Sequence, residues 1–187
     1  MKTDLMAFPA TSNLDLSGIN RPKKLTLAEF ESLPVRGQDL KRRKEIYQIE
    51  EYMHSIPGTV DDKHMHEMDM EPVHRFVAGL YHRELTIPPN TVVVGKRHAI
   101  EHIVMLTVGE CLCFTERGME EMKAPMTFIS PAGEKRIVVT RDKSCTWVTL
   151  HPTDKTDLKD VEDEVIIAEP ERAAHYEKLR ASVKEIA

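Results

Sequence analysis

At its centre the chain reads Gly95-Lys96-Arg97-His98-Ala99-Ile100-Glu101-His102-Ile103-Val104-Met105-Leu106-Thr107-Val108-Gly109-Glu110. This stretch places two histidines in an otherwise apolar run and closes on a glycine turn. With the two-residue period of a β-strand, one face carries His98, Ile100, His102, Val104 and Leu106. Such a face usually packs against the core, where an imidazole nitrogen without a partner is costly. The stretch therefore predicts a metal ion, a bound ligand or a hydrogen-bond network around His98 and His102.

Around this stretch, short runs of strand-forming residues are divided by Pro, Gly and Asn. They predict strands over 73–77, 79–87, 91–94, 99–108, 110–116, 119–123, 126–130, 135–141 and 145–151. Many short strands at close, even spacing are typical of a sandwich or barrel. We therefore expect a β-barrel domain over residues 73–151.

The flanking segments change to helical periodicity. Residues 1–72 are predicted to form an extended arm and a helical extension, with a capping box at Thr26-Leu27-Ala28-Glu29 and a helix over 39–55. The apolar positions of that helix are Ile46, Ile49, Tyr52, Met53 and Ile56. Residues 59–72 are interpreted as a linker. Residues 152–187 are predicted to form an acidic linker and a final helix over 170–185.

The composition excludes several classes of protein. A net charge of −5 argues against nucleic-acid binding through bulk positive charge, and we interpret the basic run Lys41–Lys44 as a solvated helix face. The cysteines are odd in number and lack Cys-x-x-Cys spacing, so they do not indicate a disulfide framework. No run is long and apolar enough for a signal peptide or a membrane span. We expect a soluble cytoplasmic protein.

The central stretch and the segment that follows it resemble the two motifs of the cupin family of double-stranded β-helix barrels. Gly95, His98, His102 and Gly109 fit the first motif, with His102 where its acid belongs and its first histidine replaced by Lys96 or lost to a shortened loop. Pro131-Ala132-Gly133 fits the second motif, in which Arg136 occupies the position of a histidine ligand. The resemblance implies a mainly β, cupin-type jelly roll with an incomplete metal site.

A longer frame resembles small, uncharacterised cupin-like proteins of tailed bacteriophages. It comprises the run from Gly79 to Pro88, the spacing Gly95-x-x-His98-x-x-x-His102, and the segment from Trp147 to His151. This resemblance implies a bacteriophage setting, with the host cytoplasm or the virion as the location.

In the cupin frame four side chains point into the barrel. His98 and His102 lie at its mouth, Arg136 shares a face with Val138, and Arg83 alternates with apolar residues. We expect these four residues to bind a ligand. A guanidinium group prefers carboxylate or phosphate and repels a divalent metal, so the set favours a small neutral or anionic ligand. The alternative is a pair of core histidines bonded to each other, to Glu101 of a neighbour or to backbone.

If a metal is bound, His98 and His102 are its predicted ligands and the ion is Zn, Fe, Mn or Ni. The candidates for a third ligand are His82, His151, Glu101 and Glu110, and their spacing in the sequence does not decide among them. We expect no organic cofactor.

Two functions remain. The first, which we favour, is a non-catalytic structural or binding module that self-associates or joins a larger protein assembly such as a virion. The second is a small metal-dependent enzyme of dioxygenase or isomerase type that uses His98 and His102. We expect neither a membrane nor a nucleic-acid partner for either one.

Overall fold

The computed structural model describes residues 24, 26, 29, 37–60 and 62–168. Residues 1–23 and the helix predicted over 170–185 lie outside this set. At Thr26, the reciprocal bonds of the capping box are present: the Thr26 N–H donates to Glu29, and the Glu29 N–H donates to the Thr26 hydroxyl.

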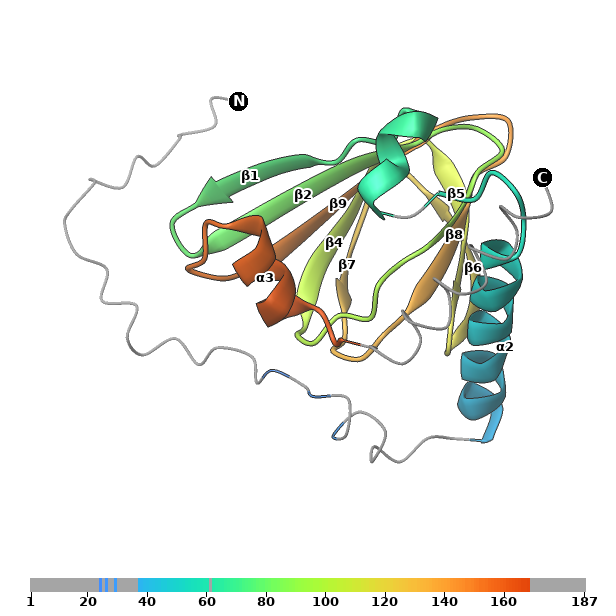
Figure 1. Ribbon diagram of the computed structural model, residues 1–187, viewed down its shortest axis with the longest axis horizontal. Coiled ribbons are helices and arrows are strands. Elements are labelled where there is room, and N and C mark those ends of the chain that lie inside the picture. Colours follow the sequence, from blue (N-terminus) through green and yellow to red (C-terminus); the bar gives the residue numbers. More distant parts are fainter. Residues whose placement is uncertain (1–23, 25, 27–28, 30–36, 61, 169–187) are drawn as a thin grey trace, which may run out of the picture.

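Within the described residues, nine strands form two antiparallel sheets that face each other (Figure 1). The five-stranded sheet has the order β1 (Val73–Val77), β2 (Leu80–Ile87), β9 (Cys145–Pro152), β4 (His102–Val108) and β7 (Met126–Ser130). The four-stranded sheet has the order β3 (Val92–Val94), β8 (Arg136–Val139), β5 (Glu110–Thr115) and β6 (Gly118–Lys123). The prediction of a mainly β fold is confirmed by these two packed antiparallel sheets.

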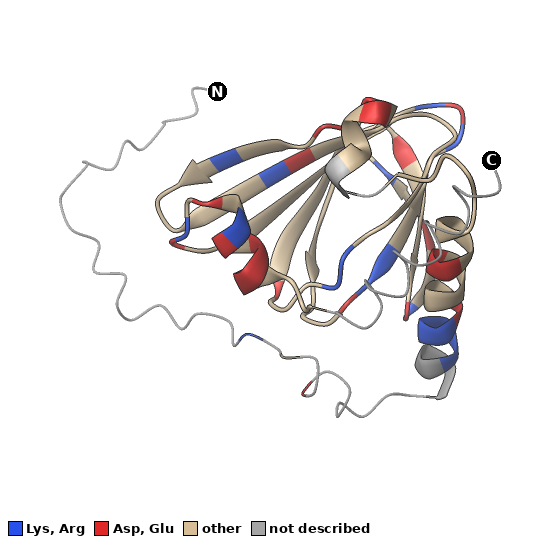
Figure 2. Cartoon of the chain, in the orientation of Figure 1, with Lys and Arg blue, Asp and Glu red and all other residues tan. Residues whose placement is uncertain are grey.

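The inner face of the five-stranded sheet is built in rows that follow from the strand register. One row holds Leu85, Trp147, Leu106 and Met126, and the next holds Arg83, Thr149, Val104 and Phe128. Strands β9, β4 and β7 carry no Lys, Arg, Asp or Glu (Figure 2). Apolar rows of this kind form the main core between the two sheets.

Strand β4 begins at His102, whereas the sequence predicted a strand from residue 99. Residues 97–99 instead form backbone contacts with residues 165–167. His98 forms a bridge with Ile166, the Ala99 N–H donates to the Val165 carbonyl at 2.7 Å, and the Ile167 N–H donates to the Arg97 carbonyl at 2.9 Å. The segment after helix α3 (Leu158–Val165) therefore takes the backbone partners that a longer β4 would have used.

Two segments interpreted as linkers pack against the barrel. The short 3-10 helix η2 (Asp62–Met68) and the residues after it bury Met65 and Met70 in the main core. Asp157 caps α3 by accepting from two backbone N–H groups, and α3 buries Val161 and Val165. These two valines join Tyr81 and Ile100 in a second apolar cluster beside His98, so α3 covers one end of the barrel.

Helix α2 (Gly37–His54) lies beside the four-stranded sheet (Figure 1) and contacts the barrel through a charged face. Ile46 is only 4% exposed, as its apolar pattern predicted, but Tyr52 is 67% exposed. Two of these contacts are ion pairs, between Arg43 and Glu116 at 2.9 Å and between Glu50 and Lys135 at 2.7 Å. In a third contact, Arg97 donates a hydrogen bond of 2.9 Å to the Tyr47 hydroxyl. Positions 43, 46, 47 and 50 share one helix face, because they are three or four residues apart.

Gly109 explains why the central stretch ends on glycine. Its φ of +79° is a left-handed conformation that other residues rarely adopt. A Cβ atom here would also lie 2.1 Å from the Ser144 carbonyl oxygen, on the segment that leads into β9. Only glycine fits the turn between β4 and β5.

Candidate metal centre

Three histidines, two from the same stretch of chain and one from a distant strand, stack at the end of the barrel that α3 covers. His98 comes from the loop before β4, His102 is the first residue of β4, and His151 lies on β9. Their ring centroids are 4.2 Å apart for His98 and His102, 4.4 Å for His102 and His151, and 4.9 Å for His98 and His151. One ring nitrogen of each lies within 4.8 Å of the other two. His102 and His151 are buried, and His98 is partly exposed.

Two buried ring nitrogens of the triad have no hydrogen-bond partner. His102 donates from Nδ1 to the Ile100 carbonyl at 3.1 Å, which leaves the lone pair on Nε2. His98 Nδ1 and His151 Nε2 share a hydrogen bond of 2.8 Å. His102 Nε2 and His151 Nδ1 are buried and have no hydrogen-bond partner. A network of core histidines therefore does not account for all their polar atoms, since a buried orphan costs about 1–3 kcal/mol.

The environment keeps the three rings neutral. Burial lowers the pKa of His102 to about 4, with a smaller lowering effect of the Arg136 charge. Burial, His102 and the charges of Arg83 and Arg136 lower the pKa of His151 to about 3. The pKa of His98 is also well below its usual value, first through burial and then through the two other histidines and both arginines. At neutral pH each imidazole therefore keeps one lone pair, and one of the three is engaged in the hydrogen bond between His98 and His151.

These residues fit a divalent transition metal. Neutral imidazoles suit Zn, Fe, Cu and Ni. One ring nitrogen from each histidine lies within 4.8 Å of the other two, so modest side-chain shifts would bring three nitrogens to 2.0–2.1 Å from a shared ion. The Ile100 carbonyl also fixes the tautomer of His102, as outer-shell acceptors do in metal sites.

Arg136 points into the same interior, but its charge is offset. It is buried, donates to the Ser130 hydroxyl, and forms an ion pair with Glu134 at 2.6 Å. Its guanidinium group also lies over the rings of Phe128 and Trp147. The repulsion expected between Arg136 and a metal is therefore weakened by the Glu134 carboxylate.

The structure separates the four candidates for a third ligand. His151 lies with His98 and His102. Its alternation with Trp147 on the buried face of β9 is the sequence signal that could have identified it as the third ligand. His82 lies on the other face of β2, near Arg75 and Glu84. Glu101 is exposed, and Glu110 forms an exposed ion pair with Lys143. Arg83 faces inward between Tyr81 and Leu85, as its alternation predicted.

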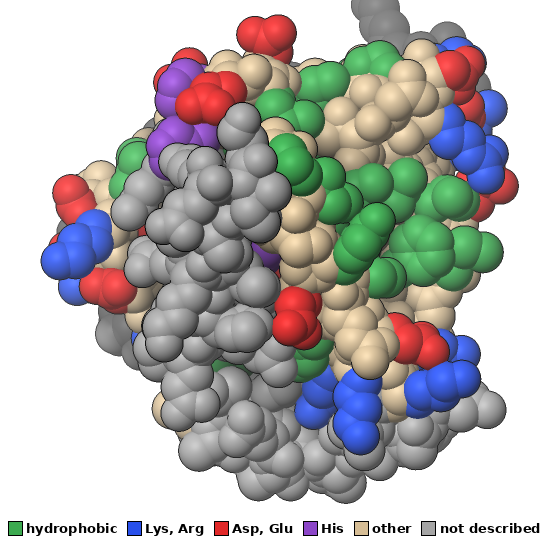
Figure 3. Space-filling model, turned by 45° about the vertical axis from the view of Figure 1, so that its right-hand side comes forward, with side chains coloured by type: hydrophobic (Ala, Val, Ile, Leu, Met, Phe, Trp, Pro, Cys, Tyr) green, Lys and Arg blue, Asp and Glu red, His purple; other side chains and the backbone are tan. Residues whose placement is uncertain are grey.

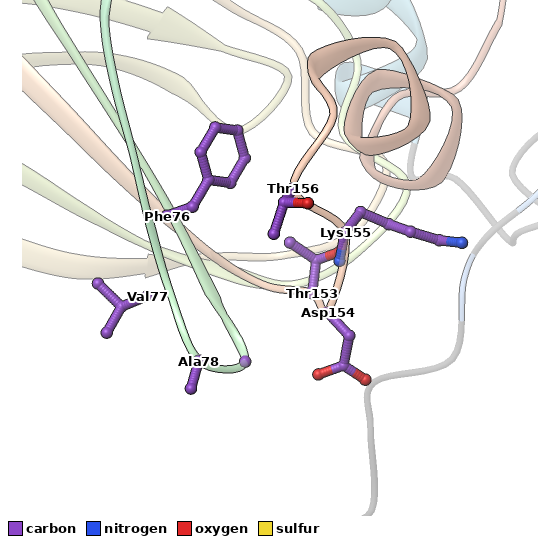
Figure 4. Close-up of a pocket in the computed structure, with 8 residues that line it drawn as sticks. Phe76, Val77, Ala78, Thr153, Asp154, Lys155 and Thr156 are labelled. Atoms are coloured by element: carbon purple, nitrogen blue, oxygen red, sulfur yellow. The ribbon is translucent and has the colours of Figure 1, made fainter.

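A separate surface pocket of about 310 Å³ lies between the β1–β2 turn and residues 153–156 (Figure 4). No residue of the triad lines it. Thr153 and Thr156 face Phe76 across it, whereas the side chain of Lys155 extends away (Figure 4). The pocket brings together no set of converging polar groups, so the triad is the stronger candidate site.

No protein-family model matches the sequence, and neither does any curated protein. Similar solved structures include a cupin domain from Bordetella pertussis, at 18% identity and a TM-score of 0.38 over 45% of this chain and 93% of that one. The polyketide cyclase RemF from Streptomyces resistomycificus has 19% identity and a TM-score of 0.39 over 46% of this chain and 75% of that one. A cupin-superfamily sugar phosphate isomerase from Silicibacter pomeroyi has 19% identity and a TM-score of 0.36, over 41% and 52% of the two chains.

Among the residues that the structure describes, no helix combines the length and the apolar composition needed to cross a lipid bilayer.

Proposed function

We propose that this chain is a small metal-dependent enzyme of cupin type, in which His98, His102 and His151 hold one divalent transition-metal ion. The observation that carries the proposal is the pair of buried, unpartnered nitrogens on His102 and His151, in contact with a third imidazole. The sequence favoured a non-catalytic module because the metal motif was incomplete, an arginine pointed inward, and helical extensions were expected at both ends. The third histidine reverses that preference.

The number of ligands favours catalysis over a structural role. Structural zinc sites are usually closed by four protein ligands, whereas catalytic sites keep three and leave a position for water or substrate. When bound here, the ion would supply Lewis-acid chemistry and activate a coordinated water or substrate oxygen. Both reaction types expected from the sequence, dioxygenase and isomerase, use such an open position.

The surrounding residues orient the ligands and exclude water. The Ile100 carbonyl holds the His102 ring, and Tyr81 packs against His151 at a centroid distance of 5.9 Å. The Tyr81 hydroxyl is in turn hydrogen-bonded to His74 Nδ1 at 2.7 Å. Beneath the triad, Trp147 and Phe128 provide an apolar floor.

Metal titration tests this proposal. Protein stripped with a chelator and titrated with Ni²⁺ or Zn²⁺ is expected to bind one ion per chain and to unfold at a higher temperature, because the ion binds only the folded site. Calorimetry gives the stoichiometry, and thermal denaturation gives the shift. A Co²⁺ spectrum without nitrogen-ligand absorption, or the absence of saturable binding at micromolar concentration, would contradict it.

Self-association is a second candidate, favoured by exposed apolar side chains. Ile49, Tyr52 and Ile56 are exposed on or just after α2, and Ile103 and Ile129 are exposed as register partners on the outer face of the five-stranded sheet. Apolar side chains also gather on the face shown in Figure 3. Grouped surface of this kind often marks a protein interface. The virion role implied by the bacteriophage resemblance stays a prediction.

Light scattering at micromolar concentration tests self-association. We expect a mass that is a multiple of 21.4 kDa, and replacement of Ile103 and Ile129 by Thr should lower it. A single species near 21.4 kDa in the unaltered protein would rule out a stable oligomer.

A further inference from the structure

The row of side chains next to the triad contains two polar groups without a structural role. Arg83 on β2 and Thr149 on β9 are register partners, and both lie on the inward face of the five-stranded sheet. Along β9 the inward positions are Cys145, Trp147, Thr149 and His151, all buried. Arg83 and Thr149 therefore lie one row deeper than His151, between the triad and the apolar rows.

Thr149 is buried, with only 6% of its surface exposed, and its hydroxyl oxygen has no hydrogen-bond partner. Its neighbours across the sheet are Val104 and Arg83. A buried hydroxyl without a partner is costly, and valine would fill the same volume without that cost. The position thus carries an oxygen that the fold does not use.

Arg83 has no hydrogen bond or ion pair in the described part of the chain. This distinguishes it from Arg136, whose charge is offset by Glu134. Arg83 nonetheless lies close to the triad, because Tyr81, two residues before it on β2, is the register partner of His151. An inward cation without a carboxylate partner, beside an unpartnered hydroxyl, is the arrangement that an incoming anion would complete.

We propose that Arg83 and Thr149 bind the carboxylate of a small organic acid, whose remaining polar group reaches the metal position at the triad. This inference rests on the proposed function and names its class of substrate. A guanidinium fork donates two parallel bonds to the two oxygens of a carboxylate, and the hydroxyl of Thr149 adds a third. A phosphate group carries a charge of about −1.5 to −2 at neutral pH, more than the single positive charge of Arg83 would balance.

Pyruvate and its neutral isostere pyruvamide test the proposal by calorimetry on the Ni²⁺-loaded protein. Pyruvate is expected to bind at least about tenfold more tightly than pyruvamide, because only the carboxylate forms the charge-assisted bonds. The variant R83M should lose about tenfold or more of the pyruvate affinity, and T149V should lose less, since it removes a single neutral donor.

The variant R75M is the matched control. Arg75 lies on the neighbouring strand β1, but its side chain is exposed and paired with Glu84 at 2.9 Å, so pyruvate affinity should be unchanged. Metal content is measured on every variant and should stay at the level of the unaltered protein. Three results would overturn the proposal: equal binding of pyruvate and pyruvamide, tighter binding of inorganic phosphate, or pyruvate affinity unchanged in R83M.

The outcomes also separate this proposal from the metal site. If no metal binds but the metal-free protein is stabilised by pyruvate in a way that depends on Arg83, the metal proposal fails and the carboxylate site stands. If metal binds through the triad but the affinity for pyruvate is the same in R83M as in the unaltered protein, the carboxylate site is ruled out and the metal site stands.

Discussion

Replacing His151 by alanine is expected to weaken Ni²⁺ or Zn²⁺ binding about 100-fold or more. Loss of an outer-shell partner alone typically costs metal sites 10–100-fold, and His151 is proposed as one of only three protein ligands. The substitution removes the one triad member that belongs to β9. Competition with a chromophoric chelator measures the affinity, and circular dichroism checks that the variant remains folded.

His82 provides the matched control for this experiment. It is a histidine on the same sheet, but its side chain lies on the outer face near Arg75 and Glu84. His82→Ala should bind metal as the unaltered protein does. His98→Ala gives a second test with a smaller effect on folding, because His98 is partly exposed. Metal affinity unchanged in both His98→Ala and His151→Ala would place any bound metal elsewhere.

Replacing Glu116 by alanine is expected to lower the free energy of unfolding by about 3–5 kcal/mol, the usual effect of removing one partner from a buried ion pair. Glu116 accepts from Arg97 at 2.9 Å through one oxygen and from Arg43 of α2 at 2.9 Å through the other. The Arg97 side chain is completely buried and also donates to the Gly133 carbonyl. Without Glu116, a buried guanidinium would lose its carboxylate.

Urea denaturation measures this effect, with Glu121→Ala as the control. Glu121 pairs with Arg141 at 3.4 Å, but both side chains are mostly exposed, so its loss should cost less than about 1 kcal/mol. A similar small loss in Glu116→Ala would show that the buried pair does not stabilise the barrel and its contact with α2.

The strands could be predicted from the sequence with little error, because alternation of apolar side chains and turn-forming residues are local signals. The expected strand over 126–130 matches β7, and the strand over 79–87 differs from β2 by one residue. The inward orientation of His102 and Arg83 followed from the same alternation. The start of β4 could not be predicted from alternation, because His98 forms a backbone bridge with Ile166, which lies far along the chain.

On the face of α2 that contacts the barrel, the sequence correctly predicted only the burial of Ile46. The apolar positions of this helix suggested that Ile49 and Tyr52 pack inward, but Arg43, Tyr47 and Glu50 make the contacts. A charged helix face predicts burial only when its partners are known. Here those partners, Arg97, Glu116 and Lys135, come from three different loops or strand ends.

The sequence by itself determined the mainly β fold class, most of the strand limits and the inward orientation of two histidines and two arginines. Only the tertiary structure selected His151 from four candidate ligands and paired Arg83 with Thr149. The reason is that a strand's period fixes which face a side chain occupies, while the register between distant strands fixes its neighbours. That register depends on the packing of the whole barrel, and no local pattern in the sequence encodes it.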